Sequence, residues 1–205
     1  MYIEAKSMIE MKHAKLSSNR AVEGSAIYLV QTCTSISFDN ITLFNNSASS
    51  SGTIKISGSS TNCSNFCTSC KFINNTASFG TEYSSSFYQV VVKSAPPTTV
   101  DVGQLFSLSL AAQDFYNNQI SGSSLAITVT AIVPYELNYL GIASQYIDSN
   151  GVATFNAIAL EGPAGSYNLQ FVTNPVSTTV IVPIHISPCM EGYKLNYSLC
   201  IDFFI

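Results

Sequence analysis

The sequence predicts an all-β chain made of three consecutive parts. A pattern of apolar residues, asparagine and alanine recurs three times within residues 1–88, which indicates stacked β-strand repeats. Residues 90–187 alternate apolar and polar side chains with a period of two, which is typical of strands with one buried face. Residues 188–205 add two more cysteines. We therefore expect a short β-solenoid, a β-sandwich and a small cysteine-rich segment.

The repeat is clearest around Asn19, Asn46 and Asn75, which are separated by 27 and 29 residues. Apolar residues keep the same spacing. Their columns are Leu16, Leu43 and Phe72; Met11, Phe38 and Cys67; Ala14, Ile41 and Cys70; Ala21, Ala48 and Ala77; and Ile27, Ile54 and Tyr83. A fixed period without helical periodicity indicates about three coils of a β-solenoid. The alternative is chance repetition of common residues.

The recurrent asparagine predicts a ladder of side-chain amides. We expect Asn19, Asn46 and Asn75 to occupy tight turns, to tolerate left-handed backbone geometry and to hydrogen-bond one another between coils. Asn45 and Asn74 precede two of them and carry glycosylation sequons, whereas the ladder residues do not. A glycan is compatible with an outward neighbour of the ladder and not with the ladder itself.

The stretches GSAIYL, SGTIKIS, LFNNSA and FINNTA resemble the paired GGAI and FxxN motifs of polymorphic outer membrane protein repeats. The resemblance implies a right-handed parallel β-helix of the pectin-lyase type in residues 1–88, forming the C-terminal end of a longer solenoid. It also implies surface display and adhesion, as in large surface proteins of unicellular eukaryotes. Leu16 and Leu43 replace the usual Phe, and Gly80-Thr81-Glu82 departs from GGAI.

Four stretches of residues 90–187 alternate strictly, and turn-forming segments (YNNQISG, DSNG and EGPAG) fall between them. Their predicted buried faces are Phe106, Leu108, Leu110 and Ala112; Ile127, Val129, Ala131 and Val133; Tyr167, Leu169 and Phe171; and Val180, Val182, Ile184 and Ile186. Short strands with regular turns indicate a β-sandwich, and Pro183 marks an edge strand.

The stretches AQDFYNNQISG, DSNGVATFNAIAL and GPAGSYNLQFV resemble filamin-type and invasin-type Ig-like repeats. The resemblance implies an Ig-like sandwich that acts as a spacer or adhesion platform. Its turns would carry Asp114, Tyr116 and Asn118; Asp148, Gly151 and Phe155; and Gly165, Tyr167 and Leu169. Asn117 stands where the family has Gly, and Gln119 where it has Pro.

The segment PCMEGYKLNYSLC resembles the start of a growth-factor-receptor-like cysteine-rich module, which implies a Cys189–Cys200 disulfide and a truncated module. We expect the chain to be a piece of a longer protein. The spacing of Cys63, Cys67 and Cys70 admits a zinc site, but structural zinc takes four ligands and no fourth is near in sequence. Buried thiols, or a bridge between coils such as Cys33–Cys63, are favoured. No metal and no cofactor are expected.

Composition bounds the function. Only 10% of residues are charged, the net charge is −4 and Arg20 is the single arginine, which excludes nucleic acid as a partner. Sequons and clustered cysteines favour a secretory route and an extracellular or cell-surface location. The N-terminal residues do not form a signal peptide, and no run of about 18 apolar residues predicts a membrane span. The candidate glycosylation sites are Asn40, Asn45, Asn62, Asn74 and Asn196.

Catalysis is not expected, because the carboxylates do not recur at the same position of successive repeats and would not cluster. Arg20 is the single arginine of the sequence and has no second arginine beside it. His13 and His185 have no nucleophile motif beside them. The predicted function is a structural or adhesive segment of a large extracellular or cell-surface glycoprotein. Its partners would be surface proteins or carbohydrates, and it would meet a membrane only through segments outside this sequence. The alternative is a carbohydrate-binding or polysaccharide-processing β-helix protein whose active coils lie outside the sequence.

Overall fold

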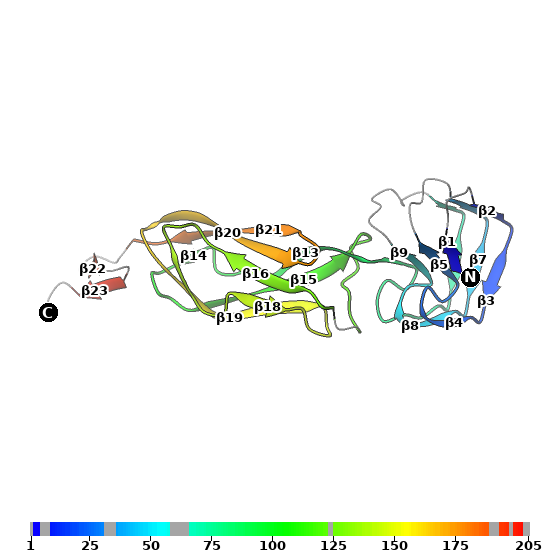
Figure 1. Cartoon of the computed structure of the whole chain (residues 1–205), viewed down its shortest axis with the longest axis horizontal. Helices are drawn as coiled ribbons and strands as arrows, with labels where there is room; N and C mark the ends of the chain where they lie inside the picture. Colours follow the sequence, from blue (N-terminus) through cyan, green and yellow to red (C-terminus); the bar gives the residue numbers. More distant parts are fainter. Residues whose placement is uncertain are drawn as a thin grey trace. The chain divides into compact units, whose positions relative to one another are not determined.

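Figure 1 shows a computed structural model of the chain, which describes residues 2–4, 9–30, 36–57, 66–122, 125–188, 193–196 and 199–202. These residues form β-strands joined by turns, with no α-helix among them, so the all-β prediction is confirmed. The chain divides into two compact units. The first contains residues 1–89, 113–123 and 149–151, and the second contains residues 90–112, 124–148 and 152–205.

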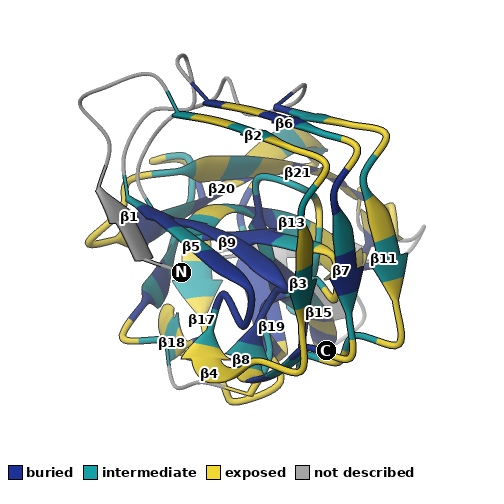
Figure 2. Cartoon of the chain, turned by 90° about the vertical axis from the view of Figure 1, so that its right-hand side faces the viewer, coloured by how far each residue is buried: buried dark blue, intermediate teal, exposed yellow. Residues whose placement is uncertain are grey.

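Four groups of parallel strands make up the first unit, and each group takes its strands from successive repeats. Figure 2 shows the strands of each group side by side. In spatial order the groups are β1 (Tyr2–Glu4), β5 (Ile27–Val30), β9 (Ile54–Ser57) and β12 (Tyr83–Ser85); β10 (Cys67–Thr68), β6 (Ile36–Asp39) and β2 (Ile9–Lys12); β11 (Lys71–Ile73), β7 (Thr42–Phe44) and β3 (Lys15–Ser17); and β4 (Arg20–Glu23) with β8 (Ser47–Ser51).

The register of these groups matches the sequence alignment of the repeats position by position. Leu43 pairs with Leu16 on one side and Phe72 on the other. Phe38 pairs in the same way with Met11 and Cys67. Ile27, Ile54 and Tyr83 form a third column. Side chains of one phase therefore lie above one another at the strand spacing of about 4.8 Å.

The interior of the first unit is a continuous apolar core. Its largest fully buried side chains include Ile27, Phe38, Ile41, Leu43 and Ile54. The equivalent residues at the two ends, such as Leu16 and Phe72, are half-buried and pack against this cluster. Each central strand thus buries its inward residues between two neighbours, which is why the stack needs several repeats to be stable.

The three ladder asparagines are hydrogen-bonded in series. The Nδ2 of Asn19 donates to Oδ1 of Asn46 at 2.8 Å, and the Nδ2 of Asn46 donates to Oδ1 of Asn75 at 3.0 Å. The backbone N–H groups of Asn19 and Asn46 donate to the same two oxygens. Asn46, which is only 1% exposed, also donates from Nδ2 to the Leu16 carbonyl at 3.0 Å. Every donor of this buried amide is used.

The prediction of left-handed geometry at the ladder residues is wrong by one position. The positive φ angles belong to the residues before them: Ser18 (58°), Asn45 (54°) and Asn74 (53°). The preceding residue makes the corner, and the ladder residue then resumes an ordinary backbone and turns its amide inward. A second corner, at His13, Asn40 and Ser69, also has positive φ and was not predicted.

Two larger sheets lie in the second unit (Figure 1). One contains β13 (Phe87–Ser94), β15 (Phe106–Asp114), β19 (Val152–Glu161) and β17 (Asn138–Leu140) in that order. The other contains β14 (Thr99–Val100), β21 (Thr179–Ile186), β20 (Gly165–Asn174), β16 (Thr128–Ile132) and β18 (Ser144–Tyr146). The rings of Phe155 and Phe171, one from each sheet, lie 5.1 Å apart, so the buried faces of the sheets meet.

Most of the apolar faces predicted from alternation are buried. Leu108, Leu110, Leu169 and Phe171 are fully covered, whereas Ala131 and Val133 are only half-buried. Pro183 lies in β21, which pairs with β20 along its length and with β14 only at His185 and Ile186. β21 is therefore an inner strand of the sheet and not the edge strand that was predicted. Its pairing with β14 does not extend to Pro183.

The last strands, β22 (Tyr193–Asn196) and β23 (Leu199–Asp202), form an antiparallel pair. Cys189 lies outside the described residues, as do the side chains of Asn196 and Cys200. The predicted Cys189–Cys200 disulfide therefore stays a prediction.

The sequence-based boundary between Phe87 and Val90 differs from the observed division in one respect. Residues 113–123 and 149–151, assigned above to the predicted sandwich, cluster with the first unit. The units are therefore not continuous stretches of chain, because two connections between strands of the predicted sandwich join the first unit.

Asn46→Asp is expected to lower the free energy of unfolding of the first unit by about 3 kcal/mol, because a buried carboxylate cannot donate to Leu16 and would face the Asn75 oxygen. The measurement is a urea titration that follows the backbone amide signals of β7 and β9 by NMR. Asn45→Asp is the matched control, since Asn45 is exposed and Asp tolerates its positive φ. Equal stability of the two variants would contradict the structural role of the ladder.

Candidate functional site

An open hollow of about 680 Å³ lies beside β4 and β5 in the first unit. Arg20 and Glu23 on β4 line it, together with Tyr28 on β5. Asn19, Ser25 and Ser57 complete its polar lining. The volume falls in the range of about 300–1,000 Å³ that small-molecule sites occupy.

A buried lysine, Lys55 on β9, adjoins this side of the unit. It is 5% exposed, and its Nζ donates to the Ser85 carbonyl at 2.7 Å. The same Nζ lies 3.7 Å from the Glu23 carboxylate and 5.5 Å from the ring centre of Phe79. Burial lowers the pKa of Lys55, and the charges of Glu23 and Asp114 oppose this shift. Alternation along β9 alone would have assigned this lysine to solvent.

Glu23 is held by two partners. Besides Lys55, the Ser51 hydroxyl donates to its Oε1 at 3.3 Å. Because Lys55 and Glu23 have opposite charges, the pair is neutral as a unit, and Arg20 adds one positive charge to the rim of the hollow.

Glycine forms the corner that separates β4 from β5. Gly24, Gly52 and Gly80 have φ between 56° and 58° and occupy equivalent positions in the three repeats. A Cβ at Gly24 would lie 2.5 Å from the Ile27 carbonyl oxygen, so a larger residue does not fit. The recurrent glycine noted in the sequence is therefore required by the backbone of this corner.

Segment 113–123 packs on the last repeat of the first unit through a buried carboxylate. Asp114 is 0% exposed, and its Oδ2 accepts the Ser85 backbone N–H at 2.9 Å. Its Oδ1 accepts the N–H groups of Tyr116 and Asn118, both at 2.9 Å. The Asn118 amide in turn donates to the Tyr83 carbonyl at 2.9 Å. The turn that the Ig-like motif predicted is present, and it also satisfies backbone groups of β12.

A series of aromatic rings covers the same end of the core. Tyr83 lies 4.9 Å from Phe72, 5.6 Å from Phe66 and 5.7 Å from Tyr116, measured between ring centres. Burial, aided by the Glu82 charge, raises the pKa of Tyr83 to about 12. Burial and the Asp114 charge also raise the pKa of Tyr116.

Three candidate glycosylation sites lie in the described part of the first unit. Asn40, Asn45 and Asn74 are exposed, and each sits at a corner with positive φ. Asn40 is hydrogen-bonded to the His13 ring at 3.0 Å, and the sequon hydroxyl of Thr76 donates to that of Ser47 at 3.0 Å. Asn62 lies outside the described residues, as does the side chain of Asn196.

Cys67 and Cys70 form a disulfide, which corrects the expectation of buried thiols at these positions. Both are half-buried at the edge of the core. A three-residue separation across the Ser69 corner lets the two interior positions approach one another. Cys33 and Cys63 lie outside the described residues, so their predicted bridge is untested.

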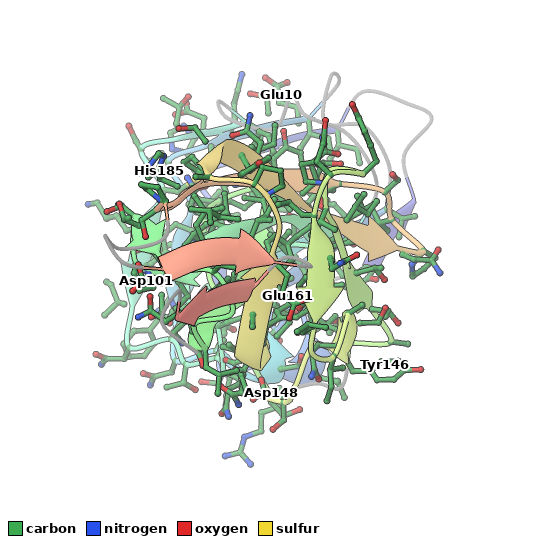
Figure 3. The ribbon with its side chains drawn as sticks, turned by 90° about the vertical axis from the view of Figure 1, so that its left-hand side faces the viewer. Glu10, Asp101, Tyr146, Asp148, Glu161 and His185 are labelled. Carbon is green, nitrogen blue, oxygen red and sulfur yellow. A yellow bond between two sulfur atoms is a disulfide. The ribbon has the colours of Figure 1, made fainter. Side chains whose placement is uncertain are left out.

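The predicted turn residues of the second unit have turn roles. Asp148 accepts the Val152 N–H at 2.8 Å, and the Tyr167 hydroxyl donates to the Pro163 carbonyl at 2.8 Å. In the first unit, the turn residue Asn117 has a positive φ of 64°. His185 is hydrogen-bonded to the Ser166 hydroxyl at 3.1 Å on an exposed face. Tyr146 on β18 points outward (Figure 3).

Among the residues whose positions are described, no group of three or more His, Cys, Asp or Glu side chains could hold a metal ion. The same residues contain no helix long and apolar enough to cross a membrane.

No family model matches the chain. It is 30% identical over 165 residues to metabotropic glutamate receptor-like protein Q of Dictyostelium discoideum, covering 77% of this chain and 13% of that protein. Metabotropic glutamate receptor-like protein P of the same organism is 29% identical over 189 residues, covering 87% and 13%. The chain thus spans a small fraction of each relative's length.

Solved structures give weaker matches. WR4, a C. elegans MSP family member, superposes with a TM-score of 0.34 at 12% identity, covering 48% of this chain and 98% of that one. Domains 4 and 5 of the S-layer protein SbsC give a TM-score of 0.34 at 14% identity, covering 52% and 56%. Scores this low carry no argument about the fold.

Asp114→Asn is expected to destabilise the first unit by about 2 kcal/mol, because an amide nitrogen would replace an oxygen that accepts backbone N–H groups. A urea titration that follows the β12 amide signals measures this. Glu82→Gln, a change of the same kind at an exposed neighbour, should leave the midpoint unchanged. Equal midpoints for both variants would count against the role of Asp114.

Tyr83→Phe is expected to flatten the loss of stability at alkaline pH. A tyrosine ionises at about pH 10 in the unfolded chain, whereas Tyr83 does so at about 12 in the folded one. Its contribution is therefore complete below pH 10 and is lost as the pH rises toward 12. Urea unfolding at pH 9 and 11.5 tests this, with exposed Tyr88→Phe as the control. A parallel decline in parent and Tyr83→Phe would refute it.

Proposed function

We propose that this chain is a structural segment of an extracellular or cell-surface glycoprotein, acting by shape and display without catalysis. In this proposal the first unit is a short right-handed parallel β-helix of the pectin-lyase type, and the second is an Ig-like spacer. The parallel groups in repeat register support the first assignment. The two facing sheets and the turn residues Asp114, Asp148 and Tyr167 support the second.

The observation that carries the proposal is the placement of the sequon asparagines. Asn40, Asn45 and Asn74 are all exposed and all occupy corners, whereas the adjacent ladder residue Asn46 is buried. Glycans at these corners would leave the hydrogen bonds of the asparagine ladder intact. A chain selected for secretion and glycosylation would need this separation between stacked and modified positions.

Two further observations fit a secretory route. The disulfide between Cys67 and Cys70 is of a kind that persists in oxidising compartments. The two relatives from Dictyostelium discoideum bear receptor-like names, which is compatible with a location at the cell surface.

Three described carboxylates of the first unit, those of Glu10, Glu23 and Asp114, have partners that favour a non-catalytic role. Glu10 pairs with Lys12 at 2.6 Å, and Glu23 pairs with buried Lys55. Both carboxylate oxygens of Asp114 accept hydrogen bonds from backbone N–H groups.

Peptide mapping by mass spectrometry of the chain, secreted from a eukaryotic host with and without glycosidase and reductant, tests the proposal. We expect glycans at Asn40, Asn45 and Asn74 and a Cys67–Cys70 cross-link. Thr42→Ala, which removes only the Asn40 sequon, is the control for site assignment. Bare asparagines at all three corners together with free thiols would overturn the proposal.

A further inference from the structure

A hydroxyl group without a partner marks the hollow beside β4 and β5. Ser25 lines the hollow and is 4% exposed, yet its Oγ has no hydrogen-bond partner among the described residues. A buried hydroxyl left in this state costs about 1–3 kcal/mol. Ser84 is also buried without a partner, but its Oγ lies against Gly52, away from the lining of the hollow. Of the two unsatisfied hydroxyls, the one of Ser25 thus belongs to a residue that lines the hollow.

The charge of the hollow is also incomplete. Lys55 and Glu23 neutralise one another, and Ser51 donates to the same Glu23 oxygen. The ion pairs found among the described side chains join Lys12 to Glu10 and Lys55 to Glu23, so none of them involves Arg20. Arg20 is exposed and leaves the hollow with one positive charge in excess.

We infer that this hollow binds the carboxylate group of a small polar organic acid. The Arg20 guanidinium presents paired N–H donors that match the two oxygens of a carboxylate. The Ser25 hydroxyl supplies a further donor from the buried wall. Asn19 and Ser57 offer polar contacts for hydroxyl or amino groups on the rest of the molecule.

A single unpaired positive charge favours a monoanion over a phosphate dianion, which sites built from several cations recognise better. The volume of about 680 Å³ accommodates a monosaccharide or an amino acid. The carboxylate could therefore come from an acidic sugar or from an amino acid, and the chemistry at Arg20 and Ser25 is the same for both. This inference adds a binding activity to the structural role and does not depend on glycosylation.

The test is a titration of the whole chain with D-glucuronate and with L-alanine, followed by backbone amide shifts of residues 19–30. D-Glucose and L-alaninamide are the comparators that lack the carboxylate. We expect saturable shifts with at least one of the acids and none with its comparator. A response to glucuronate alone identifies an acidic sugar as the source, and a response to alanine alone identifies an amino acid.

Two variants separate binding from folding. Arg20→Gln should weaken binding at least about tenfold, while Lys71→Gln, which removes an exposed charge from β11, should not change it. Ser25→Ala should weaken binding and yet leave the stability equal or higher, because it removes a buried unsatisfied hydroxyl.

Three outcomes would overturn the inference. The first is that neither glucuronate nor alanine causes saturable shifts. The second is that an acid and its comparator bind equally well, and the third is that Arg20→Gln binds the acid with unchanged affinity. Each leaves the glycan map untouched, so failure here and failure of the proposed surface role are distinguishable.

Discussion

In the column Asn19–Asn46–Asn75, the side-chain amides of Asn46 and Asn75 each donate and accept hydrogen bonds at once. The Oδ1 of Asn46 receives two N–H groups from Asn19, and its Nδ2 serves both Asn75 and the carbonyl of Leu16. Among short side chains only asparagine offers two donors and an acceptor in this arrangement. Since Asn46 is buried, a shift of one residue in a neighbouring strand would leave its amide groups unpaired. The register of the apolar columns, and with it the core, depends on this constraint.

The sequence predicted those parts of the first unit in which the same residue type recurs. The apolar columns and the spacing of Asn19, Asn46 and Asn75 are visible in the sequence because stacked strands place residues of the same type above one another. The corner at His13, Asn40 and Ser69 was missed because three unrelated residues share only a backbone conformation. The left-handed residue was assigned one position late, since the conspicuous asparagine is the one that turns inward and not the one that makes the corner.

The candidate site was far less visible in the sequence. Lys55 alternates with the inward residues Ile54 and Ile56 of β9. It is buried because Glu23, Phe79 and Ser85 lie around its ammonium group. Asp114 was assigned to a turn, but its contact with Ser85 joins residues 29 positions apart in different predicted domains. Ser25 lies in the GSAIYL stretch, but that motif indicates a turn of the repeat and says nothing of an unsatisfied hydroxyl. Each of these roles depends on which segments meet in space, and neither alternation nor local turn signals carry that information.

Segment 113–123 also bears on how such a stack can lengthen. By pairing with Ser85 N–H and the Tyr83 carbonyl, it occupies backbone groups of β12 that another parallel strand would use. The strands β1, β2, β3 and β4 lie at the opposite edge of their groups. A duplicated repeat inserted before β12 would present the same columns and the same corner glycine to its neighbours. One appended after β12 would have to displace Asp114 and Asn118 from Ser85 and Tyr83, so segment 113–123 closes this edge of the sheet to a further strand.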